Sequence, residues 1–336
     1  MYQVVVCPAL RLTSKRRAKF REGGFFVLNG SPNLKKDLRS IRENGEPEIH
    51  ERVDLRAWTA LGVGGLADLL IRCRSADGLQ RALDVLATHG QTWLVLGAGS
   101  RLVPPDRGLR VPVLNLSGGL GLWELDLDGA VAGGGANLAQ LCRAAQRTGL
   151  SGTDDLLNTG SSVGGAVHAA TKGDMHLAPV LDWVEFTRPG RAIERVQLPD
   201  RRGSRAVINL DLGRSVVVRA RLQLVSDQTP SRSGQSAWRR RQREQRPPRS
   251  ADPLFIDPVD GKAEAYLTNA HCVELKVGGA RLSSQRPNRI YTAKTARSSD
   301  VLELTRRIRD RVLEREEIAL EPAIRFVDED GEGIDL

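Results

Sequence analysis

The stretch TWLVLGAGSR, residues 92–101, decides the fold because an apolar run leads directly into a Gly-x-Gly-Ser turn. It follows a predicted strand at 67–75 and a predicted helix that Ser75 caps and Gly90 closes. This strand, helix and strand predict a parallel βαβ unit. A glycine turn in such a unit commonly brings backbone N–H groups against a phosphate. Arg101 follows the turn at a position where a small polar residue is expected.

Three further glycine-rich turns lie near this one. The four turns are GVGG at 62–65, GAGS at 97–100, GGGA at 133–136 and SVGGA at 162–166. Glycine allows a positive φ and a close approach of the backbone to a ligand. None of the turns is a dinucleotide fingerprint of the Gly-x-Gly-x-x-Gly type or a P-loop. Together they indicate a ligand that contains a diphosphate.

The rest of the chain alternates between short strands and amphipathic helices. Helices are expected at 34–43, 137–148, 263–270 and 299–317, a hairpin at 181–198, and strands at 215–225, 273–280 and 323–328. The helix at 299–317 is expected to bury one face, made of Val301, Leu302, Thr305, Ile308, Val312 and Leu313. The acidic stretch 328–332 is expected to fray.

The order of these motifs resembles the UDP-N-acetylenolpyruvoylglucosamine reductase (MurB) family. The matching stretches are 59–70, 94–102, 131–152, 162–167, 277–290 and 300–322. The resemblance implies an α+β protein with an FAD-binding fold of the vanillyl-alcohol oxidase/MurB type, made of two α+β FAD subdomains and a C-terminal α+β substrate-type domain. In that family NADPH reduces the flavin, and the flavin passes hydride to the enolpyruvyl group of a UDP-sugar. We therefore expect FAD, NADPH and a UDP-sugar-type small molecule as ligands.

The same resemblance implies how the chain is divided. The expected parts are a basic N-terminal extension (1–46), FAD-binding subdomain 1 (47–116), FAD-binding subdomain 2 (117–226), a basic linker (227–250), a C-terminal domain (251–328) and an acidic tail (329–336). Three of the glycine turns supply the expected FAD-binding residues. These are Gly62, Val63, Gly64, Gly65, Gly97, Ala98, Gly99, Ser100, Arg101, Ser162, Val163, Gly164 and Gly165. Arg101 could either pair with a diphosphate or block the loop.

The catalytic positions of the family do not carry the family's residues. The proton-donating Ser corresponds to Pro253, which has no side-chain proton and no backbone N–H. The Glu corresponds to Ala323, and no motif secures the family's Arg, for which Arg205 and Arg214 are both candidates. Possible stand-ins are Ser250 for the donor and Glu321 for the acid. A shift of one strand period moves a group by about 6–7 Å, which is beyond hydrogen-bond reach.

Three interpretations remain open at this point. The first is a divergent flavoprotein in which the reductase chemistry is impaired or lost. The second is a flavin-free pseudoenzyme that serves as a binding or regulatory module. The third is an active reductase with repositioned groups.

Charge and cysteine content add little to this choice. The net charge of +9 comes from two basic runs, 11–21 and 232–249. Such runs can bind nucleic acid, but only Trp238 interleaves them, and solvated segments are the simpler interpretation. The four cysteines are widely spaced, so we expect no metal site and no disulfide framework. We expect no membrane span, no secretory signal and a cytoplasmic location.

Overall fold

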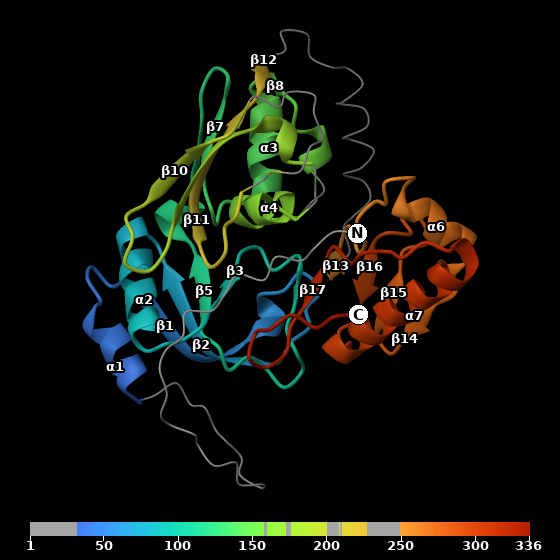
Figure 1. Ribbon diagram of the computed structural model, residues 1–336, viewed down its shortest axis with the longest axis horizontal. Coiled ribbons are helices and arrows are strands. Elements are labelled where there is room, and N and C mark those ends of the chain that lie inside the picture. The colour runs from blue at the N-terminus through green and yellow to red at the C-terminus, as the bar shows by residue number, and fades with distance from the viewer. Residues whose placement is uncertain (1–31, 158–159, 173–175, 200–207, 209, 227–248) are drawn as a thin grey trace, which may run out of the picture.

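The computed structural model describes residues 32–336 apart from 158–159, 173–175, 200–207, 209 and 227–248. The basic run 11–21, most of the run 232–249 and Arg205 lie outside the described residues. Figure 1 shows three units, each built on one main sheet with its own helices. In the described part of the chain no helix is long and apolar enough to cross a membrane.

The first unit contains the βαβ element that the sequence predicts. Its sheet has the order β1-β2-β5-β3. The elements are α1 (Pro32–Ser40), β1 (Glu48–Asp54), β2 (Leu66–Cys73), α2 (Ala76–Thr88), β3 (Leu94–Leu96) and β5 (Val113–Leu116). Ser75 caps α2 by accepting a hydrogen bond from the Gly78 N–H (3.0 Å). β2 and β3 are both parallel to β5, which lies between them, so the predicted parallel pair is not adjacent.

The helix α1 belongs to this first unit. Leu34 and Leu38 are fully buried in the same core cluster as Leu79 and Leu83 of α2. The carboxylate of Glu46 accepts hydrogen bonds from backbone N–H groups at the start of α2. The first unit therefore includes residues that lie before position 47.

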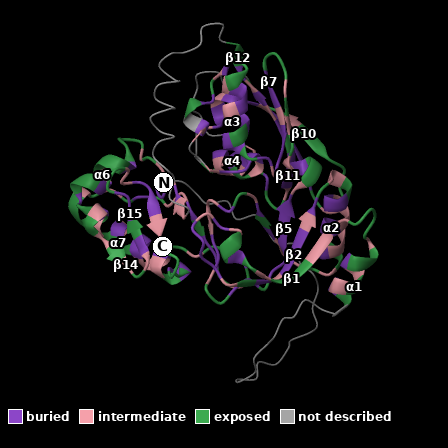
Figure 2. Cartoon of the chain, turned by 180° about the vertical axis from the view of Figure 1, so that it is seen from behind, coloured by how far each residue is buried: buried purple, intermediate pink, exposed green. Residues whose placement is uncertain are grey.

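The second unit is an antiparallel sheet packed against helices. Its order is β10-β9-β11-β7-β6. The elements are β6 (Trp123–Leu125), β7 (Gly129–Gly133), α3 (Leu138–Arg147), α4 (Val163–Ala170), β9 (Leu181–Thr187), β10 (Glu194–Gln197) and β11 (Val216–Gln223), with β8 (Leu150–Ser151) and β12 (Val225–Ser226) forming a separate pair. The predicted hairpin is confirmed as β9 and β10. Figure 2 shows that β7, β9 and β11 are largely buried, whereas the edge strand β10 is mostly exposed.

The third unit is formed by the C-terminal part of the chain. Its sheet has the order β13-β16-β15-β14 and packs against two helices. The elements are β13 (Ser250–Ala251), α6 (Ala263–Asn269), β14 (Lys276–Val277), β15 (Ala280–Leu282), β16 (Ile290–Thr292) and α7 (Ser298–Glu316).

Two predictions for the third unit are wrong in detail. The stretch 273–280 is not one strand, because Gly278 has a φ of +49° and turns the chain between β14 and β15. On α7, Leu313 is 52% exposed and Leu304 is fully buried in its place. The helix thus faces its core through Leu304 and the other expected residues.

The acidic C-terminus does not fray, contrary to the prediction. β17 (Arg325–Phe326) pairs in parallel with β4 (Leu102–Val103) of the first unit. The N–H of Arg110 donates to the carbonyl of Glu329 (2.8 Å), and Ile334 N–H donates to Phe326 (3.0 Å). Figure 1 shows this segment running back from α7 toward the first unit. Backbone hydrogen bonds and partly buried apolar side chains hold it there.

Candidate functional site

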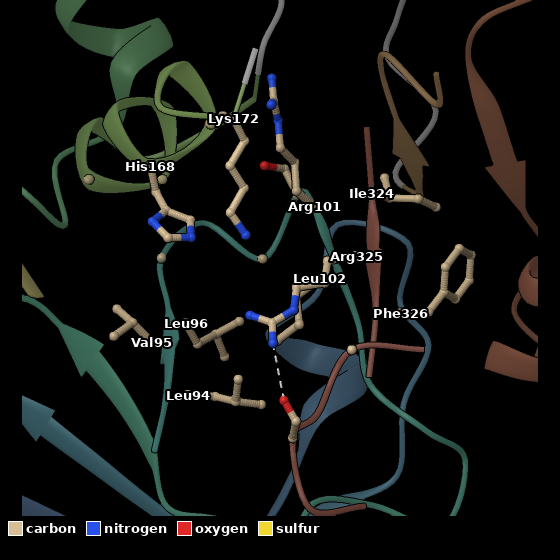
Figure 3. A pocket seen from close by; sticks show the side chains of 18 of the residues that line it. Leu94, Val95, Leu96, Arg101, Leu102, His168, Lys172, Ile324, Arg325 and Phe326 are labelled. Atoms are coloured by element: carbon tan, nitrogen blue, oxygen red, sulfur yellow. Dashed lines mark hydrogen bonds between the residues drawn. The ribbon is translucent and has the colours of Figure 1, made fainter. Parts of the chain in front are cut away.

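A cavity of about 790 Å³ lies where the three units meet. This volume is within the range of small-molecule and cofactor sites. Its walls are the β3–β4 loop, the first residues and C-terminal end of α4, the segment before β11, and the chain from Glu321 to the C-terminus. Figure 3 shows part of the lining, with the β3–β4 loop crossing the view between Leu96 and Arg101.

The shape of the β3–β4 loop depends on its glycines. A Cβ on Gly97 would lie 2.1 Å from Ser162 Oγ of the second unit. A Cβ on Gly99 would lie 1.9 Å from the carbonyl oxygen of Trp58, and Gly99 has a φ of +63°. Only glycine allows both approaches without displacement. The sequence GAGS therefore places this loop tightly between two units.

This loop leaves backbone donors available to a ligand. Its carbonyls are used internally, since the Ala60 N–H donates to Gly99 (2.9 Å) and the Asn115 amide donates to Leu96 (2.9 Å). By contrast, the N–H groups of Ala98, Gly99 and Ser100 have no acceptor within the described part of the chain. Open N–H groups on a glycine loop are suited to the oxygens of a phosphate. The loop thus fits one part of a dinucleotide such as FAD.

The SVGGA turn also reaches the cavity, but its N–H groups are already paired. Val163 donates to Ala136 (2.9 Å) and Gly164 donates to Gly134 (2.8 Å). Gly165 donates to the Ser162 side chain (3.2 Å), which caps α4. Ser162, Gly164 and Gly165 line the cavity, whereas Val163 is fully buried. The N-terminus of α4 therefore contributes shape to the site and no free donors.

The GVGG turn lies away from the cavity. A Cβ on Gly65 would lie 2.4 Å from the Asp106 carbonyl oxygen and 2.5 Å from the Gly108 nitrogen. Val63 is fully buried, and the carbonyl of Gly62 accepts a hydrogen bond from the Arg249 guanidinium (3.1 Å). None of the residues 62–65 lines the cavity described above. This turn packs the first unit against its own loop and against Arg249.

Three nitrogen-bearing side chains enter the cavity from two units. His168 and Lys172 come from α4 and the turn after it, and Arg325 comes from β17. Burial, together with the charges of Lys172 and Arg325, lowers the pKa of His168 to about 4. Burial and the charge of Arg325 also lower the pKa of Lys172. His168 is therefore a neutral imidazole at pH 7. No sequence motif marks these three residues as ligand groups.

Arg101 lines the cavity at the end of the β3–β4 loop. Its carbonyl accepts a hydrogen bond from the Arg325 N–H (2.6 Å), which begins the pairing of β17 with β4. Figure 3 shows the Arg101 side chain directed away from Arg325. The main chain of this residue thus joins the glycine loop to the C-terminal segment.

The structure brings together the two stretches that the resemblance matched to the family's catalytic positions. The Ala323 N–H donates to the Leu254 carbonyl (2.8 Å), so Ala323 lies beside the chain that follows Pro253. Ala323 lines the cavity, as does Glu321. Pro253 does not line it. Of the two acidic or donor stand-ins, only Glu321 therefore reaches the cavity.

Ser250 and Arg214, which were also expected to replace catalytic residues of the family, differ in whether they reach the cavity. Ser250 lies in β13, where its N–H donates to Ala60 (3.1 Å), and it does not line the cavity. Arg214 does line the cavity, in the segment before β11. The other candidate for the family's arginine, Arg205, lies outside the described residues.

The described residues contain no cluster of His, Cys, Asp and Glu that could hold a metal ion. Burial raises the pKa of Cys73 and Cys142 to about 12 and that of Cys272 to about 11. These three cysteines are buried thiols without a disulfide partner. Their placement suits packing and not nucleophilic chemistry.

The C-terminal segment is the part of the cavity wall that the sequence did not indicate. Residues 330–336 all line the cavity. The carboxylate of Glu329 pairs with Arg110 (2.6 Å) and approaches Arg107 (3.5 Å), which fixes the segment on the first unit. The apolar Ile334 and Leu336 pack on the core of the third unit. These two side chains are the sequence signal that could have predicted an ordered tail.

Comparison with known proteins identifies matches along most of the chain. Residues 67–186 match a family described as an FAD binding domain, and residues 242–327 match the C-terminal domain of UDP-N-acetylenolpyruvoylglucosamine reductase. The reductase of Thermus thermophilus is 35% identical over 265 residues, which cover 77% of this chain and 94% of the relative. That of Syntrophotalea carbinolica is 30% identical over 314 residues, covering 86% and 95%. The crystal structure of the Thermus caldophilus reductase has a TM-score of 0.64 at 30% identity, covering 82% of this chain and 98% of the other.

Proposed function

Because the chain belongs to the UDP-N-acetylenolpyruvoylglucosamine reductase family, we propose that it binds FAD in the cavity but reduces the enolpyruvyl sugar nucleotide poorly or not at all. One observation carries this proposal. Ala323 lines the cavity at the position that corresponds to the family's acid, and its N–H donates to the carbonyl of Leu254, the residue after Pro253, which replaces the donor.

The residues around the cavity support binding of the flavin. The open N–H groups of Ala98, Gly99 and Ser100 are placed to donate hydrogen bonds to phosphate oxygens, and the cavity volume suits a large ligand. FAD, when bound, would supply hydride chemistry, with NADPH as the expected reductant and a UDP-sugar as the expected ligand class. The chain's own part is to hold the dinucleotide against the β3–β4 loop and to close the cavity with its C-terminal segment.

The missing acid and donor account for the proposed loss of activity. Protonation of the developing carbanion needs a donor within hydrogen-bond reach, and such a group contributes about 10²–10⁴-fold to the rate. Glu321 lines the cavity two residues before Ala323, and two residues of extended chain span about 6–7 Å. Misplacement of about 1 Å already costs on the order of 10²-fold. Ser250 does not reach the cavity at all.

The test uses the full-length protein and two measurements. The visible spectrum is recorded after incubation with excess FAD and desalting, and substrate-dependent NADPH consumption is then followed. We expect retained flavin and little or no turnover. The double variant Pro253→Ser/Ala323→Glu should raise turnover, whereas Ala319→Glu, which places the same side chain on an exposed position after α7, should not.

The alternatives have distinct outcomes in the same experiment. A colourless protein after reconstitution would support a flavin-free binding module and contradict the proposal. Ordinary reductase turnover by the unmodified protein would show that Glu321 and other groups substitute for the missing residues.

A further inference from the structure

We propose that residues 328–336, which we call the strap, open as one piece to let a ligand enter and leave the cavity. Residues 330–336 all line the cavity, and the match to the family's C-terminal domain ends before the strap, at residue 327. The strap joins the first and third units, so its opening sets the rate of ligand exchange. The inference rests on the proposed function for the identity of the ligand, FAD.

One end of the strap is fixed on the first unit. The Arg110 N–H donates to the Glu329 carbonyl (2.8 Å), and the Arg110 guanidinium pairs with the Glu329 carboxylate (2.6 Å). Gly331 has a φ of +79°. A Cβ on Gly331 would lie 2.9 Å from Val111 Cγ2 and 3.1 Å from Leu94 Cγ. The strap therefore lies directly against β3, in a contact that requires glycine.

The other end of the strap is fixed on the third unit. Ile334 and Leu336 pack on the core of that unit, and the Arg309 guanidinium of α7 donates to the Leu336 carbonyl. Between the two ends, the Arg325 guanidinium of β17 donates to the Gly331 carbonyl (3.2 Å), as Figure 3 shows. The strap thus spans the cavity from one unit to another and is held at separate points.

The strap also has hydrogen bonds of its own, so it can move without unfolding. The Asp328 N–H donates to the Glu332 carbonyl (2.9 Å). The Asp328 carboxylate accepts from the Asp330 and Glu332 N–H groups (3.0 and 2.9 Å). These bonds close a turn within residues 328–332 and involve no other part of the chain. We therefore expect the turn to persist while the contacts at the two ends break.

The strap is held less firmly than the chain that precedes it. Of residues 328–336 only Gly331 is buried, whereas Phe326 and Val327 are 4% and 1% exposed. Segments with few buried groups and exposed backbone hydrogen bonds open at a lower free energy than the core. The strap is therefore a cavity wall that can open while the units stay folded, with its hinge after Val327.

A strap that only controls access affects entry and exit alike. Weakening its ends raises the fraction of molecules that are open, with or without a ligand. The association and dissociation rates of FAD then rise together, and the affinity changes little. A segment that held the ligand by direct contact would instead change mainly the dissociation rate. The two roles are therefore separable by kinetics.

The first measurement is amide hydrogen exchange of the full-length protein without ligand. Arg309→Gln weakens the third-unit end of the strap, and Gly331→Ala weakens the first-unit end. The Arg110 and Ile334 N–H groups report on the two ends, since they donate to Glu329 and Phe326. Because the strap opens as one piece, each variant should speed exchange at both ends by about 10-fold. The β2 amides should stay slow, which separates opening from unfolding.

Each variant has a matched control. Arg307→Gln changes an exposed arginine on the outer face of α7. Gly333→Ala places the same methyl group in the strap, where a Cβ would meet nothing closer than Arg325 Nε at 3.9 Å. Both controls should exchange like the unmodified protein. The proposal is overturned if each variant speeds exchange only at its own end, or if the variants exchange like their controls.

The second measurement follows FAD binding and release by stopped-flow flavin fluorescence. In Arg309→Gln and Gly331→Ala both rates should rise by about 10-fold, with the dissociation constant nearly unchanged. A rise in the dissociation rate alone, or unchanged rates despite faster amide exchange, would overturn the proposal. A protein that binds no FAD would contradict the proposed function, and the amide exchange alone would then decide whether the strap opens.

Discussion

The turns GVGG (62–65) and GAGS (97–100) have nearly the same composition and lie in the same unit, yet they have different roles. A side chain at Gly65 would meet the backbone of Asp106 and Gly108, so the first turn is a packing contact. The second turn also packs tightly, against Trp58 and Ser162, but it leaves three N–H groups open to a cavity. A glycine is thus required at both turns for close approach, and only the unpaired donors mark one of them as a ligand loop.

The largest expected effect is on folding, at the packing turn. Gly65→Ala would force its methyl against backbone atoms at 2.4 and 2.5 Å, which cannot rotate away. We expect the free energy of unfolding to fall by about 3 kcal/mol. Urea unfolding measures this change. Gly121→Ala is the matched control, because its Cβ would meet nothing within 4 Å and its φ is not positive.

The Gly65→Ala molecules that still fold test whether the packing turn contributes to ligand binding. They should retain the FAD affinity of the unmodified protein, since residues 62–65 do not line the cavity. A large loss of affinity per folded molecule would show that the packing turn also takes part in the ligand site.

The next effect concerns the ligand loop. Gly99→Ala combines a φ of +63° with a contact of 1.9 Å to the Trp58 carbonyl oxygen, so the loop must move. We expect both a loss of stability of about 1–3 kcal/mol and a loss of FAD affinity of about 10-fold or more. Fluorescence titration with FAD and urea unfolding measure the two effects. Unchanged affinity in this variant would remove the loop from the ligand site.

The third effect is a pH dependence of the free energy of unfolding, which arises from a histidine opposite the ligand loop. His168 has a pKa near 4 in the folded protein, below the ordinary value of 6.5. The unfolded chain therefore binds more protons between these values, and stability contributed by the neutral imidazole is lost as pH falls from about 6.5 to 4. Unfolding measured across this range should be less pH-dependent in His168→Gln. An identical pH profile in the variant would contradict the depressed pKa.

The smallest effect tests the C-terminal wall of the cavity. Glu329→Gln removes the ion pair with the half-exposed Arg110. We expect a loss of about 0.5 kcal/mol that diminishes at high salt. Thermal unfolding at two salt concentrations measures it, with Glu303→Gln on the outer face of α7 as the control for an exposed pair. A salt-independent loss of several kcal/mol would mean that this wall depends on more than the ion pair.

Much of the fold could be predicted from local sequence, because periodicity and capping residues act over short distances. Ser75 and the alternation at 181–197 gave the α2 cap and the β9–β10 hairpin. The insertion of β5 between β2 and β3 was not predicted, since it depends on pairing with a distant strand. The order of the tail was missed because its contacts with Arg110 and with the third unit lie far away in sequence.

The candidate site was predictable only in part, for a related reason. The GAGS residues and Ser162, Gly164 and Gly165 of SVGGA do line the cavity, but nothing local distinguishes these turns from GVGG, whose neighbours are Asp106, Gly108 and Arg249. Lys172 and Arg325 were not predicted as ligand groups, because single cationic residues in a sequence indicate a site only when the fold brings them together from two units. Residue composition predicts a loop's shape, whereas its function depends on which of its groups remain unpaired.

The most direct test of the account follows the reoxidation of bound flavin by substrate. The FAD-reconstituted protein is reduced with dithionite under anaerobic conditions, and UDP-N-acetylenolpyruvoylglucosamine is added while the visible spectrum is recorded. The account predicts that the protein retains flavin and that the substrate reoxidises it slowly or not at all, because Ala323 and Pro253 supply no acid and no donor. Rapid reoxidation, or a protein that retains no flavin, would contradict it.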